Sequence, residues 1–319
     1  MTSDPTTLAS RAPLADSGID VFRLCLGGNV FGWTADEQES FAVLDAYLAA
    51  GGNFIDTADI YSSWKLGNHG GESETIIGAW AESRGVRDEI VIASKVAKWA
   101  AHPGLHPKNI AAAIDGSLAR LQTDHVDLYY AHQEDPQTPL EDSLRAFDAL
   151  VRAGKVRAIG LSNFSASSIE LALEICERER LARPVAVQPN HSLVVRTHAD
   201  VLTLCEREHL ACMPYYALAS GFLTGKYRPG EKVDSARAGR AARFLENPHA
   251  AELLAAIDEL AAAHSTSAAA VALAWLREQP GVVAPIASAR TPAQLDELIP
   301  GATLELSADE LAQLTAAWG

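Results

Sequence analysis

Eight short apolar runs recur along the chain, and helical patterns separate them almost from end to end. The runs are β-branched and nearly continuous in apolar character, which is typical of strands buried on both faces of a parallel sheet. They occupy residues 22–28, 53–58, 90–95, 126–132, 156–163, 184–190, 211–216 and 282–287. Eight strand–helix units in one chain favour an α/β fold, a closed (β/α)8 TIM barrel, over an open doubly wound sheet.

The segments between the apolar runs begin or end with residues that are typical of helix ends, which predicts helices there. Residues 35–51 begin with acidic residues and end on glycine, whereas residues 138–154 and 165–181 each open on a capping Thr or Ser. Helical patterns also cover residues 266–279 and 307–318.

The remaining segments complete the predicted architecture. Residues 8–21 are expected to form a short N-terminal cap over the bottom of the barrel. Neither a linker nor a short-period repeat interrupts the chain, so we predict that residues 1–319 form a single domain with extra helices.

Composition limits the classes of partner. Of the 319 residues, 48% are hydrophobic, which is enough for a large core, and the net charge of −15 disfavours binding to nucleic acid or anionic membranes. The four cysteines form no CxxC pair and have no zinc-type spacing, so we expect reduced thiols, no metal site and a cytoplasmic protein. We see neither a signal peptide nor an apolar run long enough to cross a bilayer.

Nearly every run ends in polar residues. In a parallel barrel, chemistry takes place where the strands end and the following loops begin. The residues at these ends are Gly28, Asn29, Asp56, Lys95, His132, Ser162, Asn163, Gln188, Asn190, Tyr215, Ser288 and Arg290. Taken singly, Asp56 could be a turn cap and His132 a structural histidine, but together these side chains converge on one end of the barrel.

Three of these residues, together with Tyr61 in the loop after Asp56, suit proton donation to a carbonyl oxygen. Tyr61 follows Asp56 by five residues, and its phenol, with an ordinary pKa of about 10, is a weak acid at neutral pH. A Lys95 ammonium at about 4 Å would stabilise the phenolate by roughly 4 kcal/mol before desolvation costs. Asp56 would hold Lys95, and His132 would orient the substrate oxygen.

A phenol acid needs a reductant. No side chain supplies a hydride, so a nicotinamide cofactor is implied. No GxGxxG sequence follows a strand and opens a helix, so we expect no Rossmann domain and place the cofactor across the barrel mouth.

One long segment, residues 217–247, is rich in glycine and basic residues. Loops this long inside a compact domain are usually functional or disordered. Its cations are Lys226, Arg228, Lys232, Arg237, Arg240 and Arg243.

In order and spacing, the motifs resemble those of the aldo-keto reductases over about residues 14–314. The pieces that carry the resemblance are GGNFIDTADIY, GGESETIIG, IVIASK, LYYAHQED, GKVRAIGLSNFS, VQPNHSL, PYYALASGFLTGKY and PIASARTPAQLDEL. The resemblance implies a (β/α)8 barrel that binds NADP(H) in extended form. It also implies a catalytic tetrad of Asp56, Tyr61, Lys95 and His132.

The resemblance further implies a set of cofactor contacts. Ser162, Asn163 and Gln188 match positions that hold the nicotinamide carboxamide, and Tyr215 matches the ring that stacks on the nicotinamide. The other matching residues are Gly28, Asn29 and Asp56 near the first strands, Leu218, Ser220, Gly225 and Lys226 at the pyrophosphate, and Ser288, Arg290 and Gln294 at the adenosine. Arg290 could fork onto a 2′-phosphate, which favours NADPH over NADH, and residues 226–243 would form a flap.

Substrate contacts are less defined by the resemblance. Tyr216 and Ala217 stand where many relatives have Ser and Pro. The chain lacks the long C-terminal loop of steroid and aldose reductases and resembles bacterial-type members. Contacts would then come from the 62–70 loop and from Trp33, Trp64 and Trp99.

The sequence therefore predicts an NADPH-dependent reductase of aldehydes or ketones, with Tyr61 as the general acid. An alternative is a regulatory NADPH-binding subunit of the potassium-channel β-subunit type with little turnover. A third possibility is a lyase or hydrolase that uses Asp56 and His132 without a cofactor. The carbonyl substrate, the physiological direction and the oligomeric state stay open.

Overall fold

Eight parallel strands form one sheet in the computed structural model, which describes residues 10–228, 233 and 238–319. In sheet order, β10 is followed by β3 and then by each strand in turn to β9. The strands are β3 (Cys25–Gly27), β4 (Phe54–Asp56), β5 (Val91–Val96), β6 (Val126–Ala131), β7 (Val156–Ser162), β8 (Ala186–Gln188), β9 (Ala211–Cys212) and β10 (Ile286–Ala287). Each of them overlaps one of the eight apolar runs.

Main-chain hydrogen bonds join the two edges of this sheet. The N–H of Val283 donates to the carbonyl of Cys212 at 2.9 Å, and the N–H of Ile286 donates to the carbonyl of Pro214 at 2.9 Å. The sheet thus curls until β9 meets the segment that leads into β10. The prediction of a (β/α)8 TIM barrel is confirmed.

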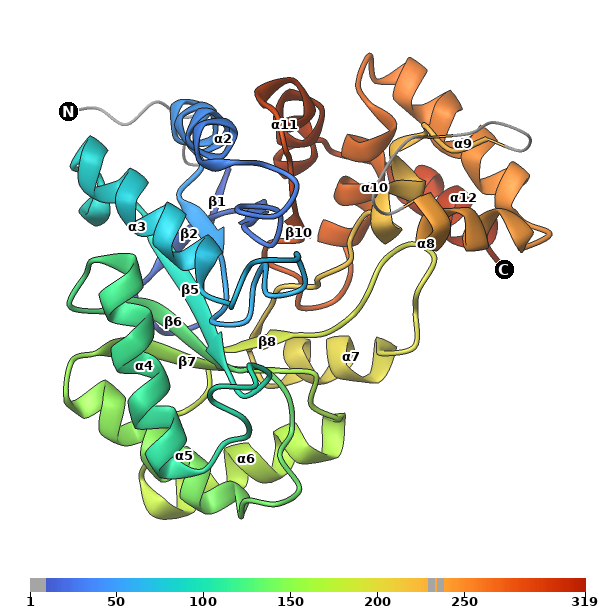
Figure 1. The fold of residues 1–319 in the computed structure, drawn as a ribbon. Helices are drawn as coiled ribbons and strands as arrows, with labels where there is room; N and C mark the ends of the chain where they lie inside the picture. The colour runs from blue at the N-terminus through green and yellow to red at the C-terminus, as the bar shows by residue number, and fades with distance from the viewer. Residues whose placement is uncertain (1–9, 229–232, 234–237) are drawn as a thin grey trace, which may run out of the picture.

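Helices surround the strands (Figure 1). Those described before β9 are α2 (Glu37–Ala49), α3 (Glu72–Arg84), α4 (Pro107–Leu121), α5 (Leu140–Arg152), α6 (Ala166–Glu179) and α7 (Ala199–Arg207). The later helices are α8 (Ala238–Ala242), α9 (Ala250–Ala263), α10 (Ala268–Arg277), α11 (Pro292–Leu298) and α12 (Ala308–Ala316). Helices α8, α9, α10 and α12 gather on one side of the barrel, which accounts for the predicted extra helices (Figure 1).

Helix starts follow the capping signals in two of the three predicted cases. Asp36 and Glu39 form a reciprocal capping box at α2, and Ser165 caps α6. The expected Thr138 cap of α5 is wrong: the N-cap residue is Pro139, without a side-chain hydrogen bond. Thr138 instead donates its hydroxyl to Asp135 Oδ2 at 2.8 Å.

Alternating side chains of the strands build two cores. In β5, Val91 and Ala93 point into the barrel interior, whereas Ile92 packs outward against the helices. The interior cluster also contains Leu14 and Ile19, which flank the turn between β1 (Arg11–Pro13) and β2 (Asp20–Phe22). This antiparallel hairpin closes the amino-terminal end of the barrel, so the predicted cap is confirmed for residues 10–21, whereas residues 8 and 9 lie outside the described residues.

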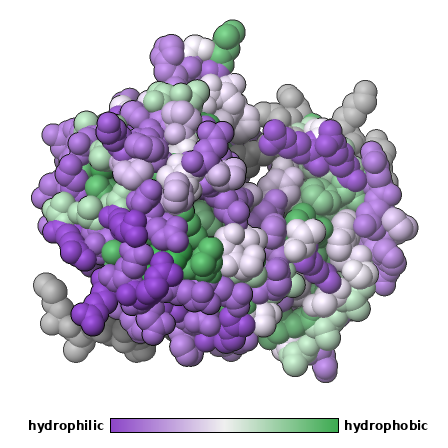
Figure 2. All heavy atoms as spheres, turned by 90° about the horizontal axis from the view of Figure 1, so that it is seen from below, coloured by the Kyte–Doolittle hydropathy of each residue, from purple (hydrophilic) through white to green (hydrophobic). Residues whose placement is uncertain are grey.

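The outer surface carries little large apolar area. Figure 2 shows a face that is mostly hydrophilic, with apolar residues in separate patches. Among the described residues, the exposed large hydrophobic side chains are Trp64, Leu66 and Leu171. In the described ranges, no helix combines the length and the apolar character needed to cross a membrane.

Leu14→Ala should destabilise the protein by about 2–4 kcal/mol, because it leaves a cavity at the closed end of the barrel. Leu14 is 0% exposed. Urea denaturation measures the loss. Leu66→Ala is the matched control, since Leu66 is 101% exposed and its truncation should change the free energy of unfolding by no more than about 0.5 kcal/mol. Equal effects of the two substitutions would contradict the assignment of Leu14 to the core.

Candidate active site

Three predicted catalytic residues meet at the carboxyl end of the barrel. Asp56 ends β4, Tyr61 lies in the turn that follows, and Lys95 lies near the end of β5. Lys95 Nζ donates to Asp56 Oδ2 at 2.7 Å, to the Thr57 carbonyl at 2.8 Å and to the Tyr61 hydroxyl at 2.8 Å. The Tyr61 hydroxyl in turn donates to Asp56 Oδ2 at 2.9 Å.

The fourth residue, His132, follows β6 and lies beside the phenol. The ring centroids of Tyr61 and His132 are 6.2 Å apart with the rings tilted edge to face. His132 is 7% exposed, and its Nδ1 has no hydrogen-bond partner among the described residues. An imidazole held this close to a phenol can contact the same substrate oxygen.

Burial is the main cause of the pKa shifts of Tyr61 and His132. It raises the pKa of Tyr61 well above its ordinary value, and the Asp56 carboxylate raises it further. The net pKa shift of Tyr61 is therefore opposite to the one expected from Lys95 alone, because burial and the Asp56 carboxylate, which bonds the phenol directly, are its leading causes. Burial, then Lys95 and Lys98, lower the pKa of His132 well below its ordinary value.

The lysine responds to opposing effects. Burial lowers the pKa of Lys95 from its ordinary value, whereas the adjacent Asp56 carboxylate raises it. At neutral pH the site thus holds a protonated phenol and a neutral imidazole beside a buried ion pair. A protonated phenol is the form that can give a proton to a carbonyl oxygen.

A second hydrogen-bonded group joins the residues expected at the nicotinamide. Gln188 Nε2 donates to Asp56 Oδ1 at 2.8 Å, which links this group to the tetrad. Asn163 Nδ2 donates to Ser162 Oγ at 3.0 Å, and the Tyr215 hydroxyl donates to Asn163 Oδ1 at 2.7 Å. The structure therefore brings Ser162, Asn163, Gln188 and Tyr215 together. The side-chain amides of Asn163 and Gln188 are already hydrogen-bonded within the protein.

The residues expected at the adenosine form two smaller contacts. Ser288 donates its hydroxyl to Asn29 Oδ1 at 2.7 Å, and the Arg290 N–H donates to Gln294 Oε1 at 3.0 Å. Within the described part of the chain, no hydrogen bond or ion pair engages the Arg290 guanidinium. Gly28 packs against the Asp56 carbonyl, where a Cβ would come within 3.1 Å.

The expected pyrophosphate loop is a strained turn around η2 (Ala219–Thr224). Its left-handed residues include Ser220 at φ 59° and Gly225 at φ 78°. Leu218 accepts the N–H of Gly221 at 2.8 Å, and a Cβ at Gly221 would lie 3.4 Å from Lys226 Nζ. Strained backbone of this kind clusters at ligand sites, and the ammonium lies against it.

The basic segment is only partly described. Lys232 and Arg237 lie outside the described residues. Arg228 pairs with Asp258 of α9 at 2.8 Å, whereas Arg240 and Arg243 are exposed.

One of the three predicted substrate-contacting tryptophans, Trp64, lies next to the phenol, and a second, Trp33, packs against Trp64. Trp64 is 6.1 Å from Tyr61 and 5.7 Å from Trp33 between ring centroids. Trp99 instead donates its indole N–H to the His69 carbonyl at 2.8 Å and lies under Arg120. Among the described residues, no ring contact joins Trp99 to Tyr61.

Asp59 was missed by the sequence analysis. It lies three residues beyond Asp56, is 0% exposed, and has no hydrogen-bond partner on either carboxylate oxygen among the described residues. Burial, then the neighbouring Glu74, raise the pKa of Asp59 to about 8. The only signal in the sequence was its position directly after an apolar run.

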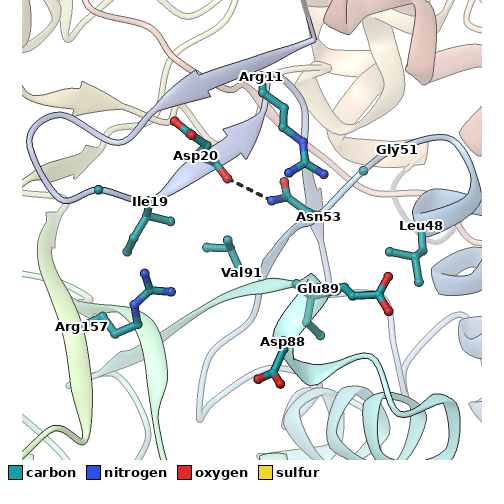
Figure 3. Close-up of a pocket in the computed structure, with 13 residues that line it drawn as sticks. Arg11, Ile19, Asp20, Leu48, Gly51, Asn53, Asp88, Glu89, Val91 and Arg157 are labelled. Atoms are coloured by element: carbon teal, nitrogen blue, oxygen red, sulfur yellow. Dashed lines mark hydrogen bonds between the residues drawn. The ribbon is translucent and has the colours of Figure 1, made fainter. Parts of the chain in front are cut away.

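A separate hollow of about 520 Å³ lies at the other end of the barrel (Figure 3). It is lined by residues of the β1–β2 hairpin and of the segments before β4 and β5, including Arg11, Asp20, Asn53 and Val91. None of the predicted site residues lines it. The described residues also contain no group of three or more His, Cys, Asp or Glu side chains placed to hold a metal ion.

Comparison with known proteins gives a consistent result. The family model "Aldo/keto reductase family" matches residues 23–319. The chain is 34% identical to Protein tas of Escherichia coli strain K12, over 94% of this chain and 95% of that protein. It is 35% identical to the uncharacterized oxidoreductase YrpG of Bacillus subtilis, covering 94% and 93%. It is 34% identical to the norsolorinic acid reductase stcV of Emericella nidulans, covering 95% and 79%.

Asp59→Asn should stabilise the protein more at pH 9 than at pH 4.5. The native carboxyl keeps its proton up to a pH of about 8, whereas the unfolded chain releases it near about 4. The wild-type protein therefore loses stability as the pH rises from about 4 to about 8, and the amide does not.

We expect the free energy of unfolding of the variant to exceed that of the wild-type protein by about 2–4 kcal/mol at pH 9 and by little at pH 4.5, as measured by urea denaturation. Asp88→Asn, at an exposed position, is the matched control and should show no such difference. A gain of equal size at both pH values would refute the assignment.

Proposed function

Because the chain belongs to the aldo/keto reductase family, we propose that it reduces an aldehyde or ketone to an alcohol with NADPH as the cofactor and Tyr61 as the proton donor. The observation that carries this proposal is the Tyr61–Lys95–Asp56 group at the carboxyl end of the strands. Similarity to a reductase and to an oxidoreductase over most of the chain supports the same class of reaction.

The chain's own residues have distinct roles in the proposal. Bound NADPH would supply the hydride that reduces the carbonyl carbon. Tyr61 gives its proton to the carbonyl oxygen, and the Lys95 ammonium stabilises the phenolate that remains. Asp56 keeps the ammonium in place, and neutral His132 orients the oxygen.

The residues around this group suit the cofactor. Arg290, with no partner for its guanidinium among the described residues, fits a 2′-phosphate, and Lys226 at the strained turn fits a diphosphate. The remaining proposed contacts are Gly28, Asn29, Asp56, Ser162, Asn163, Gln188, Tyr215, Leu218, Ser220, Gly225, Ser288 and Gln294. Binding a carboxamide at Asn163 and Gln188 requires that these amides exchange their present partners.

We also propose that residues 1–319 act as one domain in the cytoplasm. The four cysteines are buried and unpaired, as is usual in a reducing compartment. Substrate-dependent oxidation of NADPH distinguishes this enzyme from a regulatory subunit of the same family.

Tyr61→Phe should lower kcat by about 10²- to 10⁴-fold, because it removes the proton donor and leaves the ring. Oxidation of NADPH by a panel of aldehydes and ketones measures turnover. NADPH should still quench tryptophan fluorescence in the variant with an unchanged Kd. Undiminished turnover would overturn the role of Tyr61, and failure of the wild-type protein to bind NADPH would favour cofactor-free lyase or hydrolase chemistry.

Arg290→Met should weaken the binding of NADPH by about 10- to 100-fold and leave the binding of NADH nearly unchanged, because only NADPH carries the 2′-phosphate. Fluorescence titration with each cofactor gives the two Kd values. Arg240→Met is the control for a general loss of positive charge, since Arg240 is exposed. Equal losses for both cofactors would show that Arg290 does not select the phosphate.

A further inference from the structure

The chain turns sharply just beyond β5, next to the catalytic group. Ala97 directly follows β5 and has a φ of 124°, a conformation that L side chains rarely adopt. Ala97 is 3% exposed, and its carbonyl accepts the N–H of Gly104 at 2.9 Å, which closes the turn. Such a conformation costs about 1–3 kcal/mol and persists only where the surroundings impose it. The surroundings therefore hold the next residue, Lys98, in a defined place.

Lys98 is half-buried, and its ammonium has no described partner. No hydrogen bond or ion pair with any described residue engages Lys98 Nζ. Burial, then Lys95, lower the pKa of Lys98, and the charge of Lys98 in turn lowers the pKa of His132. Lys98 follows Lys95 by three residues, just beyond the carboxyl end of the strand that holds Lys95. Lys98 is thus a partly buried lysine without a carboxylate partner among the described residues, in a chain with 41 acidic and 26 basic residues.

The position of Lys98 in the barrel separates it from the proposed phosphate contacts. Those contacts follow β9 and β10, whereas Lys98 follows β5. In the sheet order, β5 is the third strand from β10 and the fourth from β9. The cofactor phosphates proposed near Arg290 and Lys226 therefore do not account for the Lys98 ammonium, and Lys98 belongs instead to the loop that follows the strand carrying Lys95.

We propose that Lys98 binds a carboxylate of the substrate, so that this protein prefers carbonyl compounds that also carry an acid group. The inference rests on the proposed function and names its substrate class. A carboxylate on the substrate would supply the acceptor that Lys98 lacks, and it would fix the substrate at a second point. Two fixed points align the carbonyl with Tyr61 better than one.

The test uses two aldehydes that differ only in one charge, 4-carboxybenzaldehyde and its methyl ester. For each aldehyde, kcat/KM is measured with NADPH for the wild-type protein and for Lys98→Met. We expect the variant to lose about 10- to 100-fold more kcat/KM with the acid than with the ester, mainly through KM. Lys98→Arg should keep the preference for the acid. Lys108→Met, at an exposed position of α4, is the matched control and should leave both values unchanged.

Each other outcome overturns the inference. Equal losses with the acid and the ester would mean that Lys98 acts through His132 and not on the substrate. No loss with either aldehyde would mean that Lys98 contacts neither.

A binding measurement separates this inference from the proposed function. If the wild-type protein oxidises NADPH with no aldehyde or ketone of the panel, the proposed function fails. In that case, a calorimetric titration of the protein with 4-methylbenzoate still tests whether Lys98 binds a carboxylate. Weaker binding by Lys98→Met than by Lys108→Met supports the site, and equal binding overturns it.

Discussion

The buried ion pair between Lys95 and Asp56 determines the shape of the site. An ammonium has three N–H donors, and one removed from water is tolerated only when an opposite charge and acceptors surround it. The last residue of β4 and the turn after it supply all three acceptors, namely the Asp56 carboxylate, the Thr57 carbonyl and the Tyr61 hydroxyl. The position of the phenol is therefore a consequence of neutralising the lysine, and Gln188 extends the same arrangement to β8.

The strands could be predicted because a parallel strand covered on both faces is apolar throughout its length. The ends of the last two strands could not be predicted in the same way. The predicted runs 211–216 and 282–287 have six residues each, but only two residues of each run form the strands β9 and β10. Pro214 and Pro285, which lie within two residues of these strands, have no N–H to continue the hydrogen-bond ladder. The start of α5 was wrong for a related reason. The hydroxyl of Thr138 found a closer acceptor in Asp135, and a propensity for capping does not reveal such competition.

For the site, the sequence indicated which residues meet and that Asp56 and Tyr61 contact Lys95, but not the contacts that join this group to the rest of the barrel. Asp56, Tyr61 and Lys95 were predicted to lie together, because strand ends of a barrel share one edge. The bond between Gln188 and Asp56 joins residues 132 positions apart, and only the folded geometry determines it. Asp59 and Lys98 were missed because a charged residue in a loop usually lies in water. Their burial depends on neighbours from other units of the barrel.

The left-handed residues around the mouth of the barrel have a consequence for heat resistance. Tyr216, Ala219 and Ser220, like Ala97, hold positive φ angles without being glycine, whereas the eight strands of the barrel contain no residue with a positive φ. Segments that store unfavourable backbone energy relax at lower cost than the sheet beneath them. On warming, the segments that contain these residues should therefore unfold locally before the strands do. Enzyme activity should then be lost at a temperature at which the circular dichroism of the barrel is still unchanged.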